Sequence, residues 1–176
     1  MTRRFVEGTL TFDFPDDWQV CRPGETSFYR RHFQSFCGGC RKMDFVAYDP
    51  NQFILWLIEI KDYSVFPRTK LEHLADEIAG KTMDVMAMLP IAGVRDNAVS
   101  SPGHLEAGEF WNRVRRLTNI RVVLHCELPP SPSKLFPGVK DAANLQTKLN
   151  QRLRVVDHHA LFTNRAHAHP LPWIVI

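Results

Sequence analysis

Two apolar runs joined by a short turn constrain this chain more than any other part of its sequence. The runs cover residues 42–48 and 53–61, and the Asp-Pro-Asn-Gln segment at 49–52 is made of turn-forming residues. Residues 55–58, Leu-Trp-Leu-Ile, are apolar on both faces, which is typical of a central strand covered on both sides. The pattern therefore predicts an antiparallel hairpin inside a sheet.

Three charged residues interrupt these runs: Asp44 in the first, and Glu59 and Lys61 in the second. In a tight hairpin the numbers of facing residues have a constant sum, and a turn centred between residues 51 and 52 gives a sum of 103. Asp44 is then expected opposite Glu59, with Cβ atoms about 4.5–5.5 Å apart, and Lys61 on the same face. A turn one residue longer or shorter would move Asp44 to the other face.

Two facing carboxylates repel each other, and burying them costs several kcal/mol unless they are paired or bound to a metal. A divalent cation such as Mg²⁺ accepts oxygen ligands alone, so Asp44 and Glu59 together predict a metal site. The alternative is a solvated strand edge, where Glu59, Lys61 and Asp44 form an ordinary surface salt bridge worth under about 1 kcal/mol.

An Asp on one strand followed by Glu-Ile-Lys on the next resembles the PD-(D/E)xK nuclease superfamily, which has the restriction-endonuclease-like fold. Here these elements are Asp44 and residues 59–61, with Met43 where the pattern often has Pro. The resemblance implies an α/β fold with a central mixed β-sheet flanked by helices. Its core of helix, three strands, helix and strand would span about residues 25–130.

The resemblance also implies roles for individual residues. Asp44 and Glu59 would bind Mg²⁺ or Mn²⁺, with the backbone carbonyl of Ile60 as a further ligand, and Lys61 would position or activate the attacking water. Many members add an acidic ligand from the first helix, for which Glu25 is the first choice and Glu7 the second. The expected function is metal-dependent hydrolysis of phosphodiester bonds in DNA. The alternative is a catalytically inactive module of the same fold that binds nucleic acid or protein.

The charge distribution along the chain agrees with a nucleic-acid partner. Residues 1–110 hold 12 Lys and Arg against 16 Asp and Glu, whereas residues 111–176 hold 10 against 3. Basic charge concentrated in one part of a chain is what a polyanion-binding face needs. The densest cluster consists of Arg113, Arg115, Arg116 and Arg121, and a solvated helix face is an equal alternative for it.

Composition limits the class of protein. A length of 176 residues with 44% hydrophobic and 23% charged residues predicts one globular domain, residues 1–176. No apolar run reaches the roughly 18–20 residues that span a bilayer, and residues 1–5 do not lead into a signal peptide, so we expect a cytoplasmic protein without a membrane partner. Four cysteines in that compartment predict reduced thiols.

Hydrophobic periodicity predicts the elements around the hairpin. In the first part of the chain these are a strand at 9–14 that residues 18–22 could extend, a helix or aromatic-rich strand within 25–36, and a long helix from Leu71 to Leu89 that ends at Pro90. Then come a loop at 91–105, a helix carrying residues 110–117, and a strand at 120–126. The C-terminal additions at 131–176 are a helix through 142–149, a strand at 153–156 and an apolar tail at 171–176, preceded by a stiff connector at 129–133. The tail either docks in a groove or joins a subunit contact, which would make a homo-oligomer.

Cysteines and histidines suggest two further possible metal sites. Cys37 and Cys40 have the spacing of a zinc knuckle that Cys21 and Cys126 could complete, although a glycine turn with free thiols explains the segment more simply. Four histidines in the basic tail could share a metal, but surface positions or phosphate contacts are the favoured interpretation. They are His158, His159, His167 and His169.

Overall fold

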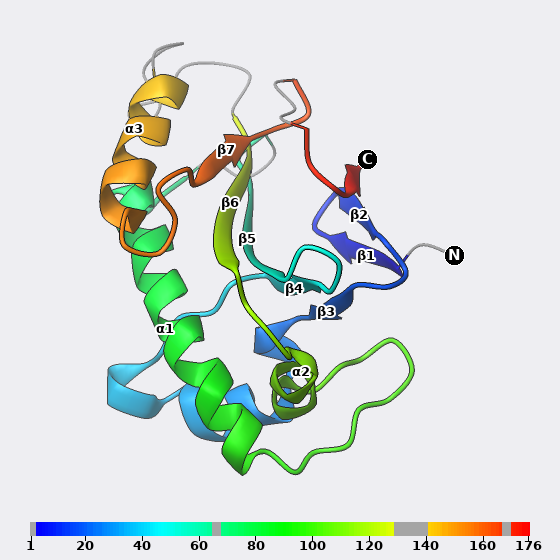
Figure 1. Ribbon diagram of the computed structural model, residues 1–176. Helices are drawn as coiled ribbons and strands as arrows, with labels where there is room; N and C mark the ends of the chain where they lie inside the picture. The colour runs from blue at the N-terminus through cyan, green and yellow to red at the C-terminus, as the bar shows by residue number, and fades with distance from the viewer. Residues whose placement is uncertain (1–2, 65–67, 129–140, 167–169) are drawn as a thin grey trace. The chain divides into compact units, whose positions relative to one another are not determined.

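The computed structural model describes residues 3–64, 68–128, 141–166 and 170–176 (Figure 1). In chain order the strands and α-helices are β1 (Arg3–Glu7), β2 (Leu10–Phe14), β3 (Gln19–Cys21), β4 (Phe45–Asp49), β5 (Ile54–Asp62), α1 (Leu74–Arg95), α2 (Ala107–Arg113), β6 (Asn119–Glu127), α3 (Asp141–Leu153), β7 (Leu161–Thr163) and β8 (Ile174–Val175). Three short helical turns lie between β3 and β4: η1 (Pro23–Glu25), η2 (Tyr29–Phe33) and η3 (Phe36–Gly38).

The chain divides into two compact units. Unit 1 comprises Met1–Asp16, Glu59–Ala79 and Arg121–Ile176, and unit 2 comprises Asp17–Ile58 and Gly80–Ile120. The boundary between the units runs through β5 and α1, because the first residues of each element belong to one unit and the last to the other. The prediction of a single domain is not tested by this division and stays a prediction.

The strands form a three-stranded sheet, β1-β2-β8, and a five-stranded sheet, β3-β4-β5-β6-β7. The pairs β3-β4 and β4-β5 are antiparallel, whereas β6-β7 is parallel, so the larger sheet is mixed. The predicted α/β class with a mixed sheet flanked by helices is thereby confirmed. The restriction-endonuclease-like core stays a prediction.

The hairpin has the register that the sequence predicts. Phe45 pairs with Ile58 and Asp49 with Ile54, which keeps the sum at 103 along the ladder. The Asp49 carboxylate shapes the turn by accepting hydrogen bonds from the backbone N–H groups of Asn51 at 2.9 Å and Gln52 at 3.2 Å. Every residue of β5 from Leu55 to Ile60 is buried, as expected of a central strand.

The apolar tail docks on its own chain within unit 1. Strand β8 pairs with β2, and the C-terminus lies beside β2 in Figure 1. Thr11 and Ile176 exchange two backbone hydrogen bonds of 2.9 Å. Trp173 is buried with its ring 5.6 Å from that of Phe14. Of the two arrangements expected for the tail, docking on the same chain is therefore observed. A subunit contact through the tail stays a prediction.

Helix α1 is longer than the sequence predicts. It begins at Leu74, leaving Leu71 exposed, and continues through Pro90 to Arg95. Proline inside a helix costs about 3 kcal/mol because it removes a hydrogen bond and clashes with the preceding turn. Pro90 itself is exposed, and the burial of Leu89 and Ala92 on either side of it offsets that cost. The predicted loop at 91–105 therefore begins only after Arg95.

Other boundaries also differ from the prediction. Helix α2 ends at Arg113, short of the expected residue 117, and β1 was not expected, because its half-exposed, charged sequence lacks a strong apolar pattern. Residues 19–21 form a separate strand in the larger sheet and do not extend β2. The predicted strand at 153–156 is wrong: Leu153 ends α3, and its carbonyl accepts hydrogen bonds from Val156 and Asp157 in a turn.

The segment at 25–36, predicted as helix or strand, is helical at η2. After it, Cys37, Gly38 and Gly39 all have positive φ angles, of 50°, 85° and 109°, which confirms the glycine turn. Cys21, Cys37, Cys40 and Cys126 are free thiols. The predicted connector at 129–133, together with His167 and His169, lies outside the described residues. His158 and His159 are exposed.

No helix in the described part of the chain is both long enough and apolar enough to cross a membrane.

Replacing Asp49 with Ala will destabilise the hairpin, because the two turn N–H groups lose their carboxylate acceptor. We expect a loss of about 1–2 kcal/mol in the free energy of unfolding, measured by urea denaturation. Asp49→Asn keeps an acceptor oxygen in place and should lose less than half of that amount. Equal stability of the Ala and Asn variants would contradict this account of the turn.

Candidate functional site

Glu59 and Lys61 project from the same face of β5, as their spacing of two residues predicts. The Lys61 ammonium Nζ lies 2.5 Å from Oε1 of Glu59. Glu59 is completely buried, whereas the Lys61 side chain is 19% exposed. Glu59 is therefore not the carboxylate of a solvated strand edge, and the pair has been withdrawn largely from water.

A second buried carboxylate, that of Glu77, also contacts Lys61. Glu77 stands in the first turn of α1, and its Oε1 lies 3.2 Å from Nζ of Lys61 and 3.3 Å from Nζ of Lys70. Its other oxygen, Oε2, lies 3.0 Å from the guanidinium of Arg68. We call Glu59, Lys61, Arg68, Lys70 and Glu77 the charge cluster; all five belong to unit 1.

The cations of the charge cluster keep Glu77 ionised despite its burial. Burial alone would raise the pKa of Glu77, but the charges of Lys61 and Lys70 and the hydrogen bond from Arg68 lower it to about 2. Arg68 is held in turn by Tyr63, whose hydroxyl oxygen accepts a hydrogen bond of 2.7 Å from the guanidinium. Burial raises the pKa of Tyr63 although Arg68 opposes the change, so the phenol stays protonated at neutral pH.

The two buried thiols of the chain's described part are not reactive nucleophiles. Burial raises the pKa of Cys126, on β6 in unit 1, to about 12, and burial likewise raises that of Cys21 in unit 2. Cys21 donates a hydrogen bond to the carbonyl oxygen of Leu105. Within the described residues, no group of three or more His, Cys, Asp or Glu side chains is arranged to hold a metal ion.

The other predicted metal ligands lie on separate elements. Asp44 is half-buried in a bend immediately before β4, and the ladder ends at the pair Phe45–Ile58. The meeting of Asp44 with Glu59 therefore stays a prediction from the register. Glu25 ends η1 and forms an ion pair of 2.8 Å with Arg22, and Glu7 ends β1.

The four predicted nucleic-acid-binding arginines lie on different parts of the chain, and their role stays a prediction. Arg113 ends α2, where it pairs with Glu109 and donates a hydrogen bond of 2.8 Å to Gln19. Arg116 is exposed, with its guanidinium 5.5 Å from the centre of the Phe53 ring. Arg121, in unit 1, donates to Asp157 at 3.2 Å and to the His159 carbonyl oxygen at 2.9 Å. Arg115 is exposed.

Sequence reasoning missed Glu77, Arg68 and Lys70. A signal for Glu77 was available, because it lies between Ala75 and Ile78 on the helix stripe whose apolar members are buried. A carboxylate on the buried side of a helix requires a cationic partner. Arg68 and Lys70 carry no such signal, since they precede α1 in a segment without periodicity.

Chemically, the charge cluster combines two buried carboxylates with an ammonium group that both of them hold. Carboxylate oxygens in a site of low dielectric constant bind hard cations, and an oriented ammonium stabilises developing negative charge. These are properties that a phosphate-handling site needs, although they also describe a purely structural ion network.

No family model matches the chain, and no solved structure matches it. The cysteine–tRNA ligase of Neisseria meningitidis serogroup A is 30% identical over 193 aligned positions, which cover 94% of this chain and 26% of the ligase. The chain therefore spans about a quarter of the length of that curated relative.

The lowered pKa of Glu77 makes a prediction about stability and pH. Relative to its ordinary value of 4.5, a folded-state pKa of about 2 stabilises the native state above pH 4.5, and this contribution is lost as the pH falls toward 2. Glu77→Gln should therefore cost about 3 kcal/mol at pH 7, and the difference from wild type should shrink steadily below pH 4.5. Urea denaturation at several pH values measures it.

Lys148→Gln is the control, because Lys148 is exposed on α3 and outside the charge cluster. Its cost should stay within about 0.5 kcal/mol at every pH. A Glu77→Gln penalty that does not change with pH would show that the carboxylate charge is not what stabilises the fold.

Proposed function

We propose that this chain is a metal-dependent nuclease of the restriction-endonuclease-like kind, which hydrolyses phosphodiester bonds in nucleic acid, with DNA as the first expected substrate. The observation that carries the proposal is the fully buried Glu59 at 2.5 Å from Lys61 on a central strand. An ion pair buried this deeply is no better for stability than apolar packing, so a functional use explains its presence.

The donor atoms available suit Mg²⁺ or Mn²⁺. Mg²⁺ is commonly bound by one or two carboxylates, with water and substrate phosphates completing the shell. Glu59 and the carbonyl of Ile60 are oxygen donors on β5, and Asp44 is the second carboxylate that the register predicts. When bound, the metal would lower the pKa of a water ligand and offset charge on the transition state.

Lys61 would orient the attacking water and stabilise the negative charge that develops on the phosphate. Its ammonium group lies 2.5 Å from Glu59 and 3.2 Å from Glu77, so its position is defined from two sides. A preorganised cation in a site largely excluded from water acts more strongly than one in solution. Glu77 would hold Lys61 in place without touching substrate.

Nucleic acid as the substrate is supported by two independent features. Basic residues outnumber acidic ones 10 to 3 beyond residue 110, and Arg115 is exposed there. The related protein from Neisseria meningitidis is named as a ligase that acts on tRNA. RNA, including tRNA, therefore belongs among the substrates to be tested beside DNA.

The second candidate function is a nucleic-acid-binding module without catalysis. It is favoured by the ion pairs of Glu77, because Lys61, Arg68 and Lys70 already balance the buried carboxylate charge. In such a module, the charge cluster would be structural.

Activity measurements separate the two functions. Purified protein is incubated with single-stranded DNA, duplex DNA and tRNA in Mg²⁺ or Mn²⁺, and cleavage is followed on denaturing gels. We expect cleavage that EDTA abolishes and that Lys61→Ala lowers by about a hundredfold or more, because an oriented charge stabiliser is worth about 3–4 kcal/mol. Glu59→Gln should abolish binding of Mn²⁺ in calorimetric titration.

Lys148→Gln serves again as the control, with cleavage at the wild-type rate. Cleavage that persists undiminished in Lys61→Ala overturns the proposed nuclease site. Absence of cleavage on every substrate, together with absence of Mn²⁺ binding, favours the non-catalytic module.

A further inference from the structure

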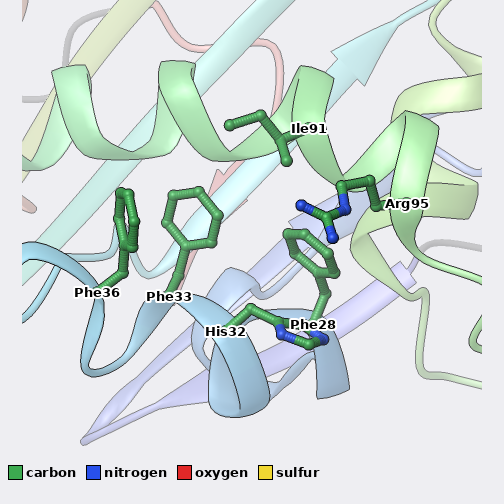
Figure 2. Close-up of a pocket in the computed structure, with 6 residues that line it drawn as sticks. All are labelled: Phe28, His32, Phe33, Phe36, Ile91 and Arg95. Carbon is green, nitrogen blue, oxygen red and sulfur yellow. The ribbon is translucent and has the colours of Figure 1, made fainter.

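Unit 2 contains a pocket, and none of the residues that line it belongs to the charge cluster. It has a volume of about 370 Å³ and lies between η2 with its neighbouring turns and the last part of α1 (Figure 2). Its lining residues are Phe28, His32, Phe33, Phe36, Ile91 and Arg95. The volume falls within the range of about 300–1,000 Å³ that is usual for small-ligand sites.

Aromatic rings form most of the wall. The ring centre of Phe33 lies 5.7 Å from that of Phe28 and 5.6 Å from that of Phe36, so the three phenyl groups form one continuous row. Figure 2 shows these rings along one side of the pocket and Ile91 reaching toward them from α1. Phe36 is 55% exposed and Ile91 is 41% exposed, whereas Phe28 and Phe33 are buried. An incoming flat ring would therefore meet Phe36, at the exposed end of the row.

The backbone conformation around residues 36–39 accounts for the exposure of Phe36. Phe36 opens η3, where the positive φ angles of the following residues turn the chain, and its carbonyl accepts a hydrogen bond of 2.9 Å from Gly39. The carbonyl of Phe33 likewise accepts a hydrogen bond of 3.2 Å from Cys40. The turn therefore holds a large apolar side chain at the surface, where it contributes little to folding.

The polar part of the lining is cationic or hydrogen-bonding. Arg95 and His32 supply the side-chain nitrogen atoms of the pocket, and among the described residues no acidic side chain lines it. Arg95 and Phe28 both line the pocket (Figure 2), and the ring centre of His32 lies 5.0 Å from that of Phe28. Arg30 and Arg31 are exposed on the same helical turn as His32. Aromatic faces beside a positively charged rim match a base with its phosphate.

We propose that this pocket binds a base of single-stranded nucleic acid, stacked on Phe36 at the exposed end of the phenyl row, with Arg95 and His32 toward the adjoining phosphate. Stacking on aromatic side chains next to basic residues is how proteins hold unpaired strands with little sequence preference. The positive rim disfavours a purely apolar occupant, and the small volume suits single rings better than the face of a partner helix. The proposal goes beyond the hydrolytic function, because it requires binding alone.

The test measures binding without turnover. A fluorescein-labelled 12-nucleotide single strand, as DNA and as RNA, is titrated with the full chain in EDTA, and fluorescence anisotropy gives Kd. The same strand with abasic sites keeps its phosphates but has no bases to stack, and a duplex of equal length has its bases paired. We expect the intact strand to bind at least fivefold more tightly than either the abasic strand or the duplex.

Variants locate the effect in the pocket. Phe36→Ala should raise Kd for the intact strand about five- to hundredfold, as expected for the loss of base stacking, and should leave Kd for the abasic strand unchanged. Val94→Ala is the control, because Val94 is 85% exposed on the same helix as Ile91 but does not line the pocket. Arg95→Gln should reduce the slope of log Kd against log salt concentration by about one.

Equal affinity for intact and abasic strands overturns the proposal on the wild-type protein alone, whatever happens to the folding of a variant. Tighter binding of the duplex, or equal effects of Phe36→Ala and Val94→Ala, overturns it as well. The titration contains no metal, and the residues that line the pocket lie in unit 2, whereas the charge cluster lies in unit 1. Failure of the nuclease proposal therefore shows in cleavage and metal binding, and failure of this one shows in strand affinity.

Discussion

The contact of Lys61 with two buried carboxylates is the interaction on which unit 1 most depends. Glu59 comes from β5 and Glu77 from the first turn of α1, so one ammonium group joins a strand to a helix. Removing two carboxylates from water is costly, and the cost is met only while the cations stay in place. Loss of Lys61 would remove one cation from beside each carboxylate, so the geometry of the strand and the helix is linked through a single side chain.

Local chemistry explains what the sequence could predict. The hairpin register follows from the four turn residues at 49–52 and from the alternation of side chains along the strands. Both features are contained within about twenty residues of sequence. The shared face of Glu59 and Lys61 follows from the same alternation. By contrast, the contact of Glu77 with Lys61 joins residues from different elements, and only packing of the helix on the strand creates it.

The errors have the same physical origin. Proline was expected to end α1 at residue 90, but burial of Leu89 and Ala92 stabilises the helix beyond it. Leu153 to Val156 were expected to form a strand because of their β-branched residues, yet Val155 is 90% exposed and Asp157 instead accepts backbone hydrogen bonds from Val122 and His159. In both places tertiary contacts outweigh local propensity.

The two carboxylates that hold Lys61 need not have the same role. Under the proposed nuclease function, Glu59 would exchange part of its contact with Lys61 for a metal ion, which would release the lysine on one side. Glu77 is itself held by Arg68 and Lys70, so it can keep its contact with Lys61 through that exchange. A lysine with one permanent and one exchangeable partner remains oriented while its surroundings change charge. In a purely structural network the second carboxylate would add desolvation cost without such a use.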